Sequence, residues 1–111
     1  MKLHHAFCTL IVALFFASGC RLQDIRTVEI HAPRVRSPEA RAIVLPALKM
    51  LRGVDLAATT FDYENGVVTV TYDSMLVAVK NIEFAFTESG FDANELPAEP
   101  LAKARLPKAL Q

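Results

Sequence analysis

The sequence predicts a small α+β domain in which a four-stranded antiparallel sheet carries two helices on one face. The chain has 111 residues, of which 52% are apolar and 22% charged, enough for one modest hydrophobic core. Stretches of alternating apolar residues, typical of strands, are interspersed with stretches whose apolar residues recur every three or four positions, typical of helices. Their order, βαββαβ, is that of the ferredoxin-like sandwich.

The first twenty residues differ from the others and are expected to be an export signal. Lys2 precedes an apolar run over residues 6–17, which is too short for a membrane-spanning helix and typical of a signal-peptide core. The next residues, Ala17-Ser18-Gly19-Cys20, resemble the lipobox of bacterial lipoproteins, in which the cysteine is lipidated and becomes the first residue. We therefore expect a signal peptide over residues 1–19 and lipid attachment at Cys20.

An ordinary secretory signal and an uncleaved short anchor remain alternatives for this segment. A lipidated chain would be held at the cell envelope and face the periplasm or the exterior. Arg21 stands where an Asp marks retention at the inner membrane of enterobacteria, which favours the outer membrane if the host has one. Cys8 and Cys20 are the only cysteines, so the remaining chain has no disulfide, thiolate zinc site or cysteine nucleophile.

The first half of the domain reads as a tether, a strand and a helix. Residues 20–26 are expected to be a lipidated tether, and alternation from Thr27 to Ala32 predicts the first strand. Ser37-Pro38 is a typical helix start, with Ser as N-cap and Pro at the first helical position. Pro46 is expected to bend this helix or loosen its first turns, and Gly53 to end it.

The second half reads as a hairpin, a helix, a strand and a tail. Asn65-Gly66 between two alternating runs predicts a hairpin, and Asp73-Ser74 is expected to open the second helix. Phe91–Leu96 is expected to be the fourth strand, which closes a domain over residues 27–96. Residues 97–111 hold three prolines and several basic residues, and are expected to be a flexible basic tail.

Residues 28–93 resemble the heavy-metal-associated (HMA) domain, the module of copper chaperones, mercury-binding periplasmic proteins and the amino-terminal repeats of copper-pumping ATPases. Three stretches carry the resemblance: Leu48-x-x-Leu51-x-Gly53-Val54, Glu64-Asn65-Gly66-x-Val68-Thr69-Val70-Thr71-Tyr72-Asp73, and Ile82-x-x-Ala85-Phe86-x-x-x-Gly90-Phe91-Asp92-Ala93. Each corresponds to a helix end, hairpin or strand of the family. The segment from Gly53 to Gly66 is longer than is usual there, which leaves the register of the second strand open.

The resemblance implies a metal loop whose ligands this chain lacks. The family binds Cu(I) or Hg(II) through Met-x-Cys-x-x-Cys between the first strand and first helix, because thiolates suit soft ions. Counting back from Gly53 puts Val35, Ser37 and Ala40 at the Met and Cys positions. We therefore expect a membrane-anchored, non-catalytic HMA-like lipoprotein that has lost this site and serves as a protein-interaction or accessory module. The alternative is a heavy-metal carrier that uses carboxylates, His31 or a partner's ligands.

Two further surfaces are candidates for interaction. Arg34, Arg36 and Arg41 flank the start of the first helix, where they could dock an anion or acidic partner. The alternative is a solvated basic loop, in a domain with 6 basic and 10 acidic residues and so a net charge of −4 over residues 27–96. Leu45, Met50 and Phe84 replace charged positions of the family and are expected to form an apolar patch for a protein partner or self-association, unless Pro46 rotates the helix and buries them.

The remaining signals argue against catalysis and nucleic-acid binding. The sequence has no glycine-rich phosphate loop, nucleophile set or recognisable carboxylate pair, so no enzyme activity and no cofactor are expected. Twelve basic residues balance twelve acidic ones, which disfavours a nucleic-acid partner.

Overall fold

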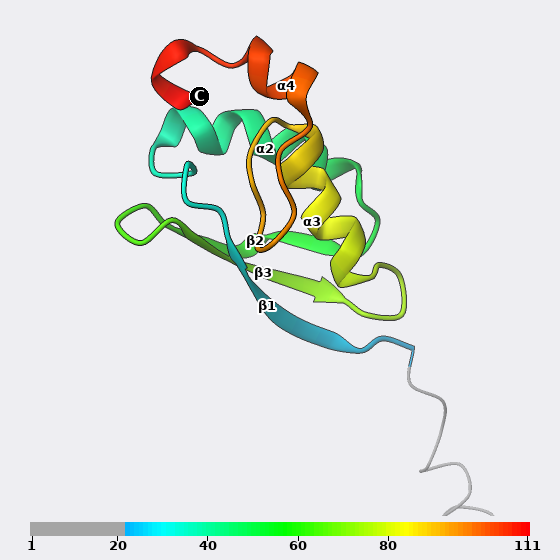
Figure 1. Cartoon of the computed structure of the whole chain (residues 1–111). Coiled ribbons are helices and arrows are strands. Elements are labelled where there is room, and N and C mark those ends of the chain that lie inside the picture. The colour runs from blue at the N-terminus through cyan, green and yellow to red at the C-terminus, as the bar shows by residue number, and fades with distance from the viewer. Residues whose placement is uncertain (1–21) are drawn as a thin grey trace, which may run out of the picture.

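The computed structural model describes residues 22–111, so the export signal and Cys20 lie outside the described residues. The elements are β1 (Ile25–His31), α2 (Pro38–Met50), β2 (Val54–Asp62), β3 (Val67–Asp73), α3 (Val79–Glu88), α4 (Pro100–Arg105) and a final 3₁₀ turn, η1 (Lys108–Leu110). They confirm the α+β class. The described strands form an antiparallel sheet in the order β1-β3-β2, with α2 and α3 on one face (Figure 1). No helix within residues 22–111 has the length and apolar content that crossing a membrane requires.

The core lies between the sheet and the two long helices. Its centre is apolar side chains with no exposed surface: Ile30, Val68 and Val70 from the sheet, Ala40, Val44 and Leu48 from α2, and Ile82 and Phe86 from α3. Full burial of a Val, Leu, Ile or Phe side chain contributes roughly 1.5–3 kcal/mol, so these contacts fix the helices on the sheet. Residues that alternate with them, such as Thr27 and Glu29, are exposed on the open face of the sheet.

The start of α2 agrees with the sequence, and Pro46 does not interrupt the helix. The Ser37 hydroxyl accepts a hydrogen bond from the Ala40 N–H at 3.2 Å, and Pro38 occupies the first helical position. The helix runs without a break from Pro38 to Met50, so the loosened first turns, one of the two effects expected of Pro46, are not seen. Gly53 (φ 102°) follows α2, and a Cβ there would lie 2.7 Å from the Cβ of Leu76. Only glycine therefore lets this turn approach the segment after β3.

A bulge in β2 accommodates the extra length before the hairpin. Asp55 pairs with Thr71 and Thr60 with Thr69, so the four residues 56–59 face the single residue Val70. The Thr59 hydroxyl donates to the Asp55 carbonyl at 2.7 Å and accepts from the Thr71 N–H at 3.4 Å. These bonds satisfy backbone groups that lose their regular partners at the bulge.

The hairpin forms where Asn65-Gly66 predicted it. The Asp62 carboxylate accepts hydrogen bonds from the side chain and backbone N–H of Asn65 and from the Glu64 N–H. These bonds, the Asn65 side chain first, hold the pKa of Asp62 below its usual range. Gly66 adopts a positive φ of 66° and returns the chain to β3.

The expected fourth strand over residues 91–96 is wrong. Asn94 has a positive φ of 53°, and an isolated bridge joins Ala93 to Leu96, so the chain turns here instead of extending. Asn94 nevertheless meets β1: its N–H donates to the His31 carbonyl at 2.8 Å, and its side-chain oxygen accepts from the His31 N–H at 2.9 Å. One residue thus caps the end of β1 where a whole strand was predicted.

The second helix and the C-terminal segment also differ from expectation. Asp73-Ser74 does not open α3, which begins at Val79; instead the Asp73 carbonyl accepts from the N–H groups of Leu76 and Val77 in a turn. Residues 97–111, expected to be a flexible tail outside the domain, form α4 and η1, on the side of the helices away from the sheet in Figure 1. The side chains of Leu106 and Leu110 join the core, which therefore extends beyond residue 96.

Candidate functional site

The loop between β1 and α2 stands where the HMA resemblance places a metal site. The Ala32 N–H donates to the Gly66 carbonyl at 2.8 Å, and the Val35 N–H donates to the Ala32 carbonyl at 2.9 Å. The loop is therefore fixed to the hairpin at one end and turned tightly on itself. Ser37 fixes its other end as the N-cap of α2.

The three positions that the resemblance assigns to the metal-side residues are used for packing and capping. Val35 is 1% exposed and Ala40 is 0% exposed, and both belong to the hydrophobic core. The Ser37 hydroxyl is engaged with the Ala40 N–H. Within residues 22–111, no three His, Cys, Asp or Glu side chains come together as a metal-ligand group. His31 is exposed at the end of β1.

Two of the three arginines near this loop interact with other parts of the domain. Arg36 donates from Nε to the Pro33 carbonyl at 2.7 Å and from Nη1 to the Glu64 carbonyl at 3.0 Å, which links the loop to the hairpin. The Arg41 guanidinium lies 5.2 Å from the centre of the Phe61 ring, a cation–π distance. Arg34 is exposed beside them. Arg36 and Arg41 thus contribute to the structure of the domain, whatever else they bind.

Solved structures share this arrangement of helices and sheet. Oxidized MerP from Ralstonia metallidurans CH34 superposes with a TM-score of 0.57 at 20% identity, over 64% of this chain and 96% of that chain. The CopZ metallochaperone gives 0.56 at 26% identity, over 62% and 100% of the two chains. A protein described as copper-ion-binding from Bacillus anthracis str. Ames gives 0.56 at 21% identity, over 64% and 97%.

The chain has the heavy-metal-associated fold. No protein-family model matches the sequence, and no curated protein is significantly similar to it. The fold is therefore shared with proteins whose sequences are only 20% to 26% identical to this one. The superposed part leaves about a third of this chain unmatched.

The apolar residues predicted as one patch do not all lie together. Leu45 is partly buried and lies one turn after Arg41, on the flank of α2 that faces β2. Met50, five residues later, is 87% exposed on the flank that faces α3. Phe84 is 47% exposed on α3. Leu45 is thus separated from Met50, which instead lines a groove of about 290 Å³ with Ala47, Leu51, Asn81, Ala85 and Glu88.

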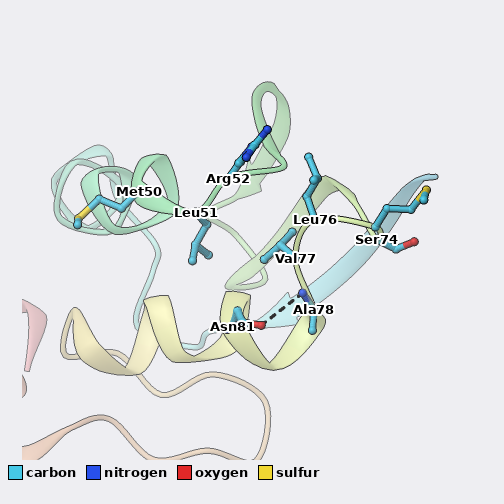
Figure 2. A pocket seen from close by; sticks show the side chains of 9 residues that line it. Met50, Leu51, Arg52, Ser74, Leu76, Val77, Ala78 and Asn81 are labelled. Carbon is cyan, nitrogen blue, oxygen red and sulfur yellow. Dashed lines mark hydrogen bonds between the residues drawn. The ribbon is translucent and has the colours of Figure 1, made fainter. Parts of the chain in front are cut away.

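A second hollow was not predicted from the sequence. It has a volume of about 370 Å³ and lies between the end of α2 and the turn that follows β3 (Figure 2). Its lining includes Met50, Leu51, Arg52, Met75, Leu76 and Val77. The available signal was Met75-Leu76, two large apolar residues directly after the turn-forming Asp73-Ser74, because a loop in water normally carries polar residues there.

Proposed function

We propose that this protein is a membrane-anchored, non-catalytic accessory module that keeps the HMA fold without a thiolate metal site. It would be lipidated at Cys20, face the periplasm or the exterior, and act by contacting a protein partner near the membrane. The outer membrane is its expected location if the host has one. The HMA fold shared with MerP and CopZ supports a role connected with metal handling.

One observation carries the absence of a thiolate site. Ala40 has no exposed surface and no side-chain atom that could bind a metal ion, and it packs among core residues at the position that the resemblance assigns to the second family cysteine. Ser37, at the first cysteine position, uses its hydroxyl to cap α2. A soft ion such as Cu(I) selects thiolates over hydroxyl groups, so residues 37 and 40 supply no suitable ligand for it.

A metal titration of the full chain decides between an accessory module and a carrier. We expect the protein not to withdraw Cu(I) from a calibrated competing chelator under reducing conditions, and Zn(II) not to raise its thermal midpoint. Tight one-to-one binding of either ion would overturn the proposal and favour a carrier with other ligands, of which His31 is the first to substitute. His31→Ala would then test that ligand directly, with the exposed Lys49→Ala as the matched control.

A further inference from the structure

Large exposed apolar side chains gather at the end of the domain where the chain arrives from the export signal. Leu22, Ile25, Met75 and Leu76 are 92%, 55%, 58% and 51% exposed. We name these four residues the anchor-side patch. In Figure 1, the turn after β3 that carries Met75 and Leu76 lies beside the start of β1.

Hydrogen bonds hold the two halves of the anchor-side patch together although they are about fifty residues apart in sequence. The Asp24 N–H donates to the Asp73 carboxylate at 3.0 Å, and the Ser74 N–H donates to the Asp24 carbonyl at 2.8 Å. The Asp73 carboxylate also accepts from the Met75 N–H at 3.0 Å. These bonds fix the start of β1 beside the turn after β3, so Ile25, which pairs with Asp73, lies close to the turn that carries Met75 and Leu76.

Basic side chains border this surface. Arg26 follows Ile25, is 63% exposed and pairs with Asp24 at 2.8 Å. Arg52 lines the hollow behind Leu76, and Figure 2 shows both side chains projecting to the same side from neighbouring turns. Apolar side chains with arginines at their border are the composition that favours the interface of a bilayer with anionic lipids.

The short tether limits how far the anchor-side patch can lie from a lipid attached at Cys20. At about 3.5 Å per extended residue, Leu22 lies at most about 7 Å from Cys20, and Ile25 at most about 18 Å. An anchor at Cys20 therefore keeps the anchor-side patch within reach of the bilayer at all times. Such tethering raises the local concentration of the surface, so even weak lipid contacts become populated.

We propose that the anchor-side patch docks on the lipid bilayer, with Met75 and Leu76 inserted at the interface and Arg26 and Arg52 among the anionic headgroups. This inference rests on the proposed membrane anchoring. It orients the domain: the β3–α3 turn faces the lipid, and α4 with Leu101 faces away. The loop at the start of α2 and the hairpin, at the other end of β1, stay open to a protein partner.

Tryptophan fluorescence tests the orientation because the chain has no natural tryptophan. L76W places the single tryptophan in the anchor-side patch, and L101W places it at a side chain of similar exposure on α4 as the matched control. The full lipidated chain is reconstituted into vesicles of phosphatidylcholine and phosphatidylglycerol, some with brominated acyl chains that quench tryptophan on contact. We expect quenching several-fold stronger in L76W than in L101W, and a further loss of quenching when Arg52→Glu is added to L76W.

Equal quenching at the two positions would overturn the docking proposal. Blue-shifted emission in L76W without quenching by brominated lipid would also overturn it, since a protein or a second copy would then cover the patch. Mass spectrometry of Cys20 separates this result from failure of the anchor. If Cys20 carries no lipid, the free thiol is coupled to a maleimide lipid, and the same quenching comparison measures docking alone.

Discussion

At the residue scale, the proposed loss of a thiolate site predicts that cysteines at positions 37 and 40 would create one, and introducing both tests the alignment. Residues 37 and 40 are three apart around the first turn of α2, where side chains lie close enough to share one ion. The positive end of the helix lowers thiol pKa values and so favours thiolate. We therefore expect the double change Ser37→Cys, Ala40→Cys to create a Cu(I) site that the parent lacks, measured by chelator competition.

The control for this prediction is the single change Ser37→Cys, which offers one thiolate and should compete weakly. Adding sulfur at the fully buried position 40 will cost some stability, roughly 1–3 kcal/mol, so folding of the double variant is checked by circular dichroism. A folded double variant that fails to bind Cu(I) would mean that the loop does not correspond to the family's metal loop.

At the element scale, the turn at Asn94 replaces the strand that was predicted over residues 91–96. Phe91 and Ala93 are buried, but burial alone does not fix backbone pairing. A left-handed residue at 94 and a proline at 97 end the extended path, and the chain then leaves the sheet. The sequence carried a hint of this turn, because Asn tolerates the left-handed conformation better than most residues.

Substitution of Asn94 separates the contribution of its left-handed backbone from that of its side-chain hydrogen bond. Asn94→Gly keeps the positive φ but removes the oxygen that accepts from the His31 N–H, whereas Asn94→Ala removes the oxygen and adds backbone strain. We expect Ala to lower the free energy of unfolding by about 1 to 2 kcal/mol more than Gly does, by urea denaturation. Equal losses would mean that the strain at residue 94 is negligible and that the strand-ending role lies elsewhere.

Residues 97–111 were predicted to be a flexible tail because the prediction relied on their prolines and basic residues and ignored the spacing of two leucines. Leu106 and Leu110 are four apart and buried, and Glu99-Pro100 is a helix start in which the Glu99 carboxylate accepts from the N–H groups of Leu101 and Ala102. The composition of residues 97–111 suggested a tail, whereas the four-residue spacing of Leu106 and Leu110 is what lets this segment pack on the core.

Truncation of these leucines measures how far the C-terminal segment belongs to the core. We expect Leu106→Ala and Leu110→Ala each to lower the free energy of unfolding by about 2 to 5 kcal/mol, because each removes a buried side chain. Leu101→Ala is the matched control: this leucine is 67% exposed on α4 and should change stability by less than about 0.5 kcal/mol. Small effects at all three positions would show that residues 97–111 behave as the tail first expected.

At the scale of the whole molecule, the sequence predicted what local patterns encode and missed what distant segments build together. Most of β1, the end of β2 and β3 follow from alternation, the start of α2 from a Ser-Pro cap, and the hairpin from Asn-Gly. The start of β1 at Ile25 lies inside residues 20–26, which were expected to be a tether. The separation of Leu45 from Met50 depends on how α2 is rotated on the sheet. The anchor-side patch depends on two hydrogen bonds between distant segments: the Asp24 N–H donates to the Asp73 carboxylate, and the Ser74 N–H donates to the Asp24 carbonyl. No local sequence pattern reveals these bonds.

Membrane retention is expected to depend on the lipid at Cys20, whereas the orientation of the domain is expected to depend on the anchor-side patch. We expect Cys20→Ser to move the protein from the membrane to the soluble fraction or to leave the precursor unprocessed, because no lipid is attached. The paired change Met75→Gln, Leu76→Gln should leave membrane retention intact, since the lipid alone holds the chain there, and should alter only the orientation of the domain.

The effect of Cys20→Ser is measured by fractionation and by gel mobility with and without globomycin, an inhibitor of lipoprotein signal peptidase. Unchanged mobility with globomycin, or full retention of Cys20→Ser with normal processing, would contradict lipidation and leave residues 6–17 as the membrane-binding element. Docking would then be tested with Cys20 coupled to lipid, because the reach from residue 20 to Leu22 and Ile25 is the same however the bilayer is attached.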